Sequence, residues 1–205
     1  MRCFVSSVAV LLLAFMLMGC SDSPAPAAKK EAEPPPAPIT GRQAFQYMFG
    51  SARLWAADSQ PLSIRSGIVP EVKNDAGKAG AWEVIFISES LGRARTYTWS
   101  AVETEGWHKG VFPGQQSSWS AGATQPFEAL QIKVDTPEAL ANATKAAADY
   151  LSKPGQKPPI NYVLEFPARS RFTTPVWRVL WGGTVSSAES MISVDASSGE
   201  VVGKN

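Results

Sequence analysis

The sequence predicts an α+β fold that consists of two repeated units, each with one helix packed on an antiparallel β-meander. Two segments, 40–58 and 135–153, carry apolar residues at helical spacing. Each segment is followed by three stretches that are rich in β-branched and aromatic residues, which is typical of strands. A single offset of 95 residues also superimposes one half of the chain on the other without gaps, as a duplicated unit would.

The first unit is predicted to span residues 40–105. The apolar face of its helix is made by Phe45, Met48, Phe49, Ala52 and Trp55. Thr40 and Gln43 form a capping-box pattern, in which each side chain bonds the backbone amide of the other residue. Strands are expected at 61–72, 81–90 and 93–103, where β-branched and aromatic residues alternate with polar ones.

The second unit is predicted to span residues 131–205. The apolar face of its helix is made by Leu140, Ala143, Ala147, Tyr150 and Leu151. We expect Thr136 as the N-cap, because Pro137 then takes the first helical position, which proline tolerates. Strands are expected at 160–169, 175–183 and 190–203.

The offset of 95 residues matches helix and strand positions together. It pairs Trp82 with Trp177, Val84 with Val179, Phe86 with Trp181, and Trp55 with Tyr150. We therefore expect Trp55 and Tyr150 in equivalent buried places, and Trp177 in the core between helix and sheet. Glu83 and Arg178 match as well, so the offset allows an ion pair between the two units.

Residues 1–19 are predicted to be a lipoprotein signal peptide. The apolar run from Val8 to Met18 is shorter than the roughly 20 residues that a membrane-spanning helix needs. The run ends in Leu-Met-Gly-Cys, and these four residues resemble the bacterial lipobox. The resemblance implies cleavage after Gly19 and lipidation of Cys20, with fatty acyl chains such as palmitate.

Residues 20–39 are predicted to be a tether between the lipidated Cys20 and the folded units. From residue 21 to residue 39 they hold six prolines and no aromatic residue, so the segment has little to bury and is stiffened by proline. The predicted location is the cell envelope, with lipid as the link to the membrane. In a Gram-negative cell, Ser21 in place of aspartate favours the outer membrane, with the protein facing the periplasm.

Composition excludes several classes of protein. Loss of Arg2 with the signal peptide leaves 18 Lys and Arg against 18 Asp and Glu. A near-zero charge without a basic cluster argues against nucleic acid as a partner. The folded part has no cysteine and one histidine, His108, which does not supply a usual metal site. We expect no metal and no cofactor.

The hairpin predicted at the C-terminus carries a family resemblance. Residues 191–203 read MISVDASSGEVVG, in which the Asp195 carboxylate can bond nearby amides and Gly199 can take a positive φ. Here the chain resembles the PepSY family and related cystatin-like domains, over residues 136–203 and, through the repeat alone, over 41–103. The resemblance implies a helix on an antiparallel meander and a binding or inhibitory role, with no shared catalytic residues.

The connection 106–130 contains the candidate binding residues. It is rich in glycine, serine and glutamine, which do not suggest a regular element, and it carries Trp107, His108, Phe112 and Trp119. Aromatic side chains on loops are effective anchors for a partner. They can equally fill a seam between the two units, and the sequence leaves both readings open.

The predicted function is that of a membrane-anchored, non-enzymatic module of the cell envelope. It would bind or inhibit an envelope protein, a peptide or a glycan. One alternative is a hydrolase on a cystatin-like scaffold that uses His108 with a carboxylate such as Glu105 or Asp135. Another alternative is a purely structural envelope component. We expect no catalytic residues under the main hypothesis.

Overall fold

The computed structural model describes residues 34–122, 124–155, 157–168 and 171–205. The residues from Pro35 to Asn205 form one compact unit. Cys20, the predicted signal peptide and most of the predicted tether lie outside the described residues.

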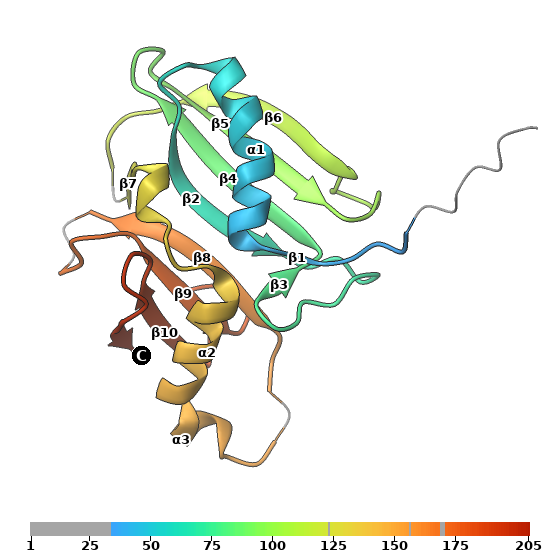
Figure 1. Cartoon of the computed structure of the whole chain (residues 1–205), viewed down its shortest axis with the longest axis vertical. Coiled ribbons are helices and arrows are strands. Elements are labelled where there is room, and N and C mark those ends of the chain that lie inside the picture. Colours follow the sequence, from blue (N-terminus) through green and yellow to red (C-terminus); the bar gives the residue numbers. More distant parts are fainter. Residues whose placement is uncertain (1–33, 123, 156, 169–170) are drawn as a thin grey trace, which may run out of the picture. The chain divides into compact units, whose positions relative to one another are not determined.

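The secondary structure follows the order helix, strands, helix, strands (Figure 1). The first half contains β1 (Ile39–Thr40), α1 (Gly41–Trp55), β2 (Gln60–Gly67), β3 (Lys78–Ala79), β4 (Ala81–Ser88), β5 (Arg93–Ser100) and β6 (Gly110–Ser118). The second half contains β7 (Thr124–Gln125), the short 3-10 helix η1 (Ala129–Gln131), α2 (Thr136–Ala146), α3 (Ala148–Leu151), β8 (Ile160–Pro167), β9 (Val176–Trp181), β10 (Ser190–Asp195) and β11 (Val201–Lys204).

Nine of the strands in the described part of the chain form one antiparallel sheet. Its order is β11-β10-β9-β8-β2-β4-β5-β6, with β7 paired to β8 beside this path. The α+β class with a large antiparallel sheet is therefore confirmed. The two halves join in this sheet through β2 and β8, where Ile64 lies opposite Leu164. We call this strand pair the seam.

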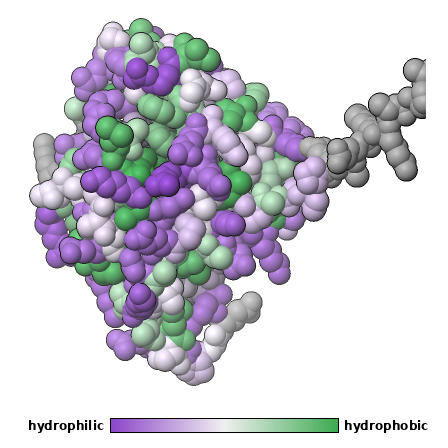
Figure 2. All heavy atoms as spheres, viewed as in Figure 1, coloured by the Kyte–Doolittle hydropathy of each residue, from purple (hydrophilic) through white to green (hydrophobic). Residues whose placement is uncertain are grey.

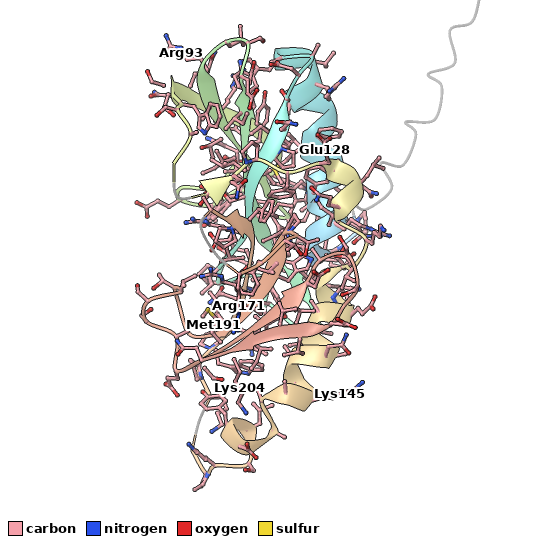
Figure 3. The ribbon with its side chains drawn as sticks, turned by 90° about the vertical axis from the view of Figure 1, so that its left-hand side faces the viewer. Arg93, Glu128, Lys145, Arg171, Met191 and Lys204 are labelled. Atoms are coloured by element: carbon pink, nitrogen blue, oxygen red, sulfur yellow. The ribbon has the colours of Figure 1, made fainter. Side chains whose placement is uncertain are left out.

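Both long helices lie on the same side of the sheet. α1 packs on β4 and β5, and α2 packs on β9 and β10 (Figures 1 and 3). In the side view of Figure 3, Lys145 of α2 points away on one side and Met191 of β10 lies on the other. We call the side without α1 and α2 the helix-free face.

One hydrophobic core runs under both helices and across the seam. Trp177 is fully buried in it, which confirms the prediction for this residue. Its indole Nε1 donates to the carbonyl of Val134 at 2.9 Å, and Trp82 donates in the same way to Ile39 at 3.0 Å. In both pairs the donor follows the acceptor by 43 residues.

Trp55 and Tyr150 occupy matching places at the ends of their helical segments. Both pack against the core, but they are half-buried rather than buried as predicted. The hydroxyl of Tyr150 explains its partial exposure, because it donates to the Glu189 carboxylate at 2.9 Å near the surface. Tyrosine commonly keeps such a polar tip in reach of water while its ring is covered.

The capping of the two helices is in part as predicted. Thr40 and Gln43 form the complete capping box of α1. For α2 the predicted N-cap, Thr136, is wrong, because Asp135 takes that place and accepts the Thr136 amide at 2.7 Å. The same Asp135 oxygen accepts the Arg42 amide of α1 at 3.0 Å. One carboxylate thus stabilises the N-termini of both helices.

The hydroxyl of Thr136 does not cap α2 but links two other segments of the chain. It donates to the carbonyl of Gly77 and accepts the Gly41 amide at 3.0 Å, so it ties the start of α1 to the start of α2. Gly41 has no room for a side chain there, since a Cβ would lie 2.7 Å from the Trp177 ring and 3.1 Å from the Trp82 ring. This close packing holds the two halves together at their centre.

The C-terminal hairpin is confirmed. Asp195 ends β10 and its carboxylate accepts the amides of Ser197 and Ser198, at 2.7 and 2.8 Å. Partial burial alone would raise the pKa of Asp195, but the hydrogen bonds from Thr174, Ser198 and Ser197 outweigh it and lower that pKa. Gly199 has a φ of 80°, which favours glycine in this turn.

The prediction that 106–130 lacks regular structure is wrong. Gly110–Ser118 forms β6, which is the edge strand next to β5, and most of its residues are exposed. An edge strand with little burial has no need for alternating apolar residues, so the usual sequence pattern is missing. Pro113 also argues against a strand in the sequence, although proline is tolerated in an edge strand such as β6.

Asp58 offers a test of the fold by pH. Hydrogen bonds from the Ser88 hydroxyl at 2.7 Å and the Ser90 amide at 2.9 Å lower its pKa to about 2. A pKa that is lower in the folded chain than in the unfolded chain stabilises the fold above the unfolded value, near 4. That stabilisation is lost as the pH falls from about 4 to about 2.

We therefore expect Asp58→Asn to flatten the acid dependence of stability. Urea unfolding at a series of pH values between 4 and 2 should show a smaller loss of unfolding free energy per pH unit in the variant than in the wild type. Equal slopes in the two proteins would contradict this role of Asp58.

Candidate functional site

A row of side chains crosses the helix-free face at the seam. Opposed residues in neighbouring strands point to the same face, and Arg65 of β2 lies opposite both Glu83 of β4 and Val163 of β8. Val163 in turn lies opposite Arg178 of β9. Glu83 follows the core residue Trp82 in its strand, so this row lies on the face opposite the helices.

A groove of about 410 Å³ opens on this row. Its floor includes Asn161, Val163 and Glu165, which alternate along β8 and so share one face. Arg65 and Arg178 stand on the two flanking strands. The other lining residues are Ser66, Tyr162, Gly183, Thr184, Val185 and Ser186.

Arg178 and Glu165 form an ion pair within the groove. The Arg178 Nη2 lies 2.9 Å from a Glu165 oxygen, and the two side chains are only 16% and 14% exposed. The pair that the offset allowed, Arg178 with Glu83, is wrong. The Nε of Arg178 is buried and finds no hydrogen-bond acceptor in the described part of the chain. An unmet buried donor costs about 1–3 kcal/mol, and the Arg178 side chain that carries it lines the groove.

Arg65 contrasts with Arg178. Its side chain is exposed, and it makes no ion pair with any described residue. It therefore keeps its full capacity for an anionic ligand. In the strand register Val163 lies between Arg65 and Arg178.

The remaining polar groups of the groove are held in place. Asn161 is buried, donates to the carbonyl of Gly182 at 2.7 Å and accepts the Ser66 hydroxyl at 3.3 Å. At the rim, Thr184 and Ser187 bond each other's amides through their hydroxyls. A site of this kind loses little conformational entropy when a ligand binds.

The structure places His108 on the surface beside Phe112. Its ring lies against Phe112 at an interplanar angle of 37°, with 4.1 Å between centroids, and its Nδ1 lies 2.8 Å from Glu103. The partners predicted for a hydrolase, Glu105 and Asp135, are therefore wrong. The Lys109 amide and the His108 ring lower the pKa of Glu103.

Trp107 packs in a small second core of the first half. It covers Val69, Val72, Ala81 and Ala101, and it lies so close to Gly67 that a Cβ there would be 2.4 Å from its ring. Trp107 is therefore half-buried, but it does not fill the seam between the halves, so that reading is wrong for this residue. This packing indicates that Trp107 stabilises the fold of the first half.

Phe112 and Trp119 also lie away from the seam. Phe112 is 42% exposed on the edge strand β6. Trp119 follows β6, is half-buried, and donates its amide to Gly92 in the turn between β4 and β5. The four predicted residues therefore do not converge on one site, although His108 and Phe112 are in contact.

The sequence patterns that predict the helices and strands do not predict the groove. A usable signal is present, because Glu83, Glu165 and Arg178 are charged residues inside largely apolar strands, and Arg65 is the one charged residue of the more polar β2. A charged residue within an apolar strand marks a face that the helices do not cover. These residues come together only because β2 pairs with β8. No local sequence pattern in either half predicts that pairing.

The helix-bearing side is a weaker candidate. Figure 2 shows hydrophilic residues dispersed among hydrophobic ones on this side. Leu54 and Leu130 are each largely exposed, at 91% and 88%. Single exposed apolar side chains are common on protein surfaces and do not define a site.

The comparisons with known proteins define a fold rather than a family. No protein family and no curated protein matches the chain. A crystal structure of a candidate lipoprotein from Clostridium difficile 630 resembles it with a TM-score of 0.50 and 11% sequence identity, over 79% of this chain and 91% of that chain. At this identity the likeness shows a shared fold alone. Among the described helices, none has the length and apolarity needed to cross a bilayer.

Proposed function

We propose that this chain is a lipid-anchored protein of the cell envelope that binds a ligand or partner on its helix-free face. The lipobox-like residues before Cys20 and the proline-rich tether support the anchor. A fold shared with a candidate lipoprotein is consistent with it. In this proposal the protein acts by binding and not by catalysis.

The observation that carries the proposal is the groove at the seam. It combines a cavity of ligand size with two guanidinium groups, one carboxylate and a buried asparagine. Concave sites with a few fixed polar groups are the usual form of small-ligand sites. A purely structural component would gain nothing from keeping a free Arg65 and an unmet Arg178 donor at one place.

We further propose that the two halves arose by duplication of a PepSY-like unit. The equal hydrogen bonds of Trp82 and Trp177, each to a carbonyl 43 residues earlier, support a common ancestor for the halves. The Asp195 hairpin supports the PepSY likeness. Under this proposal the binding groove is new to the duplicated protein, because it forms where the two units meet.

The anchor makes one prediction. Cys20→Ser should abolish lipid attachment and leave the precursor with its signal peptide, because the acylated thiol is the substrate of processing. Metabolic labelling with a palmitate analogue and membrane fractionation measure this. The proposal would be contradicted if the Cys20→Ser variant were still labelled, still processed and still recovered in the membrane fraction in the same amount as the wild type.

The binding face makes a second prediction. A photo-crosslinking amino acid at the exposed groove residue Thr184 of the full chain should give specific adducts in the intact envelope. The same group at Leu54, which is exposed on the helix side, is the matched control and should give few. Adducts at Leu54 or at Phe112, with none at Thr184, would show that another surface binds.

A further inference from the structure

We propose that the groove at the seam binds the carboxylate of its ligand between Arg65 and Arg178. This inference rests on the proposed function and names the chemical class of its ligand. The structure places Arg65 and Arg178 on either side of Val163, on the strands that flank β8, and both residues line the groove. The carboxylate would lie over Val163.

The spacing of the arginines suits one small anion. Neighbouring strands lie about 4.8 Å apart, so the backbones of β2 and β9 are separated by roughly 10 Å. Two long side chains can close on one group from this distance. A guanidinium binds a planar carboxylate through two parallel hydrogen bonds, which makes arginine the preferred residue for this recognition.

Charge favours a monoanion. Among the lining residues, Arg65, Arg178 and Glu165 together carry one net positive charge, which a single carboxylate neutralises. Glu83, which lies opposite Arg65 beside the groove, adds a negative charge that disfavours a dianion further. A phosphate dianion would leave excess negative charge beside the poorly exposed Glu165, where repulsion is weakly screened. The groove therefore selects a carboxylate over a phosphate.

The rest of the groove lining indicates that the ligand carries further polar groups in addition to its carboxylate. Ser66, Asn161, Thr184 and Ser186 add hydroxyl and amide groups along the lining, and the volume of about 410 Å³ has room for more than an isolated anion. The carboxylate can belong to the C-terminus of a peptide or to a sugar acid. The two sources share the same recognition at the arginines.

Titration calorimetry of the full mature chain in detergent tests the inference. The probes are N-acetyl-dialanine for a peptide terminus, glucuronate for a sugar acid, and inorganic phosphate. The amide of N-acetyl-dialanine, which lacks the charge, is the matched control. We expect at least one carboxylate to bind, and the amide and phosphate to bind at least tenfold more weakly.

Variants locate the binding. Arg65→Gln should weaken carboxylate binding by tenfold or more, as expected for loss of a hydrogen-bonded charge, and Arg65→Lys should have an intermediate effect. Arg93→Gln is the control, since this exposed arginine of β5 lies outside the groove (Figure 3). Arg178→Gln combined with Glu165→Gln removes the second guanidinium without leaving a buried charge, and should also weaken binding.

The outcomes separate this inference from the proposed function. Equal binding of acid and amide, tighter binding of phosphate, or unchanged carboxylate affinity in Arg65→Gln would overturn the carboxylate assignment. Absence of binding by both carboxylates would overturn it as well. If crosslinks at Thr184 persist in any of these cases, the groove still binds a ligand and only its chemical class is wrong.

Discussion

Trp177→Ala is expected to lower the free energy of unfolding by about 3–5 kcal/mol, the usual cost of removing a large aromatic side chain from a core. Trp177 is fully buried, packs against the start of α1 and donates to the carbonyl of Val134. The variant therefore loses packing and leaves a buried carbonyl without its donor.

Trp82→Ala should give a loss of similar size, because Trp82 makes the equivalent contacts in the first half. Urea unfolding followed by circular dichroism measures both variants. Trp119→Ala, in which the side chain is half-buried, is the control and should lose clearly less. A small effect in Trp177→Ala would show that the centre of the molecule is not packed as described.

Arg178→Met is the second variant with a large expected effect. It leaves the Glu165 carboxylate poorly exposed and without its partner, and removing one member of a buried ion pair costs about 3–5 kcal/mol. The partial exposure of the pair makes the lower end of this range the expectation. Replacing both residues, as Glu165→Leu with Arg178→Met, should recover most of the loss because no lone charge is left.

The exposed pair of His108 and Glu103 provides the comparison. Surface ion pairs are screened by water and contribute little to stability, so His108→Ala should change the unfolding free energy little. Equal effects of Arg178→Met and His108→Ala would show that the groove pair is not shielded from water. A double variant as unstable as Arg178→Met alone would show that the cost lies in packing rather than in charge.

Local chemistry made much of the fold predictable. The capping box at Thr40, the Asp195 hairpin and the buried Trp177 each depend on nearby residues or on helical and strand periodicity. The sequence does not distinguish Asp135 from Thr136 as the N-cap of α2. Aspartate and threonine are both good N-cap residues, and the proline after Thr136 favours the wrong one. Only the tertiary contact with Gly77 distinguishes them.

The parts that could not be predicted depend on contacts between distant residues. The pairing of β2 with β8 brings Arg65 beside Val163, and neither strand carries a signal for its partner. The edge strand β6 has no buried face to impose alternation. The sequence predicts binding residues among the aromatics of 106–130, whereas the groove is made by charged residues inside strands.

Methyl NMR of valine residues tests the central claim, that the helix-free face over the seam is the binding surface. Val163 lies in the groove, and Val179 in the neighbouring strand belongs to the core on the helix side, so the two report on opposite faces. When detergent-solubilised envelope extract is added to the labelled mature chain, we expect the Val163 methyl signals to shift and those of Val179 to stay. Shifts at Val111 in the edge strand β6, with Val163 unchanged, would contradict the account.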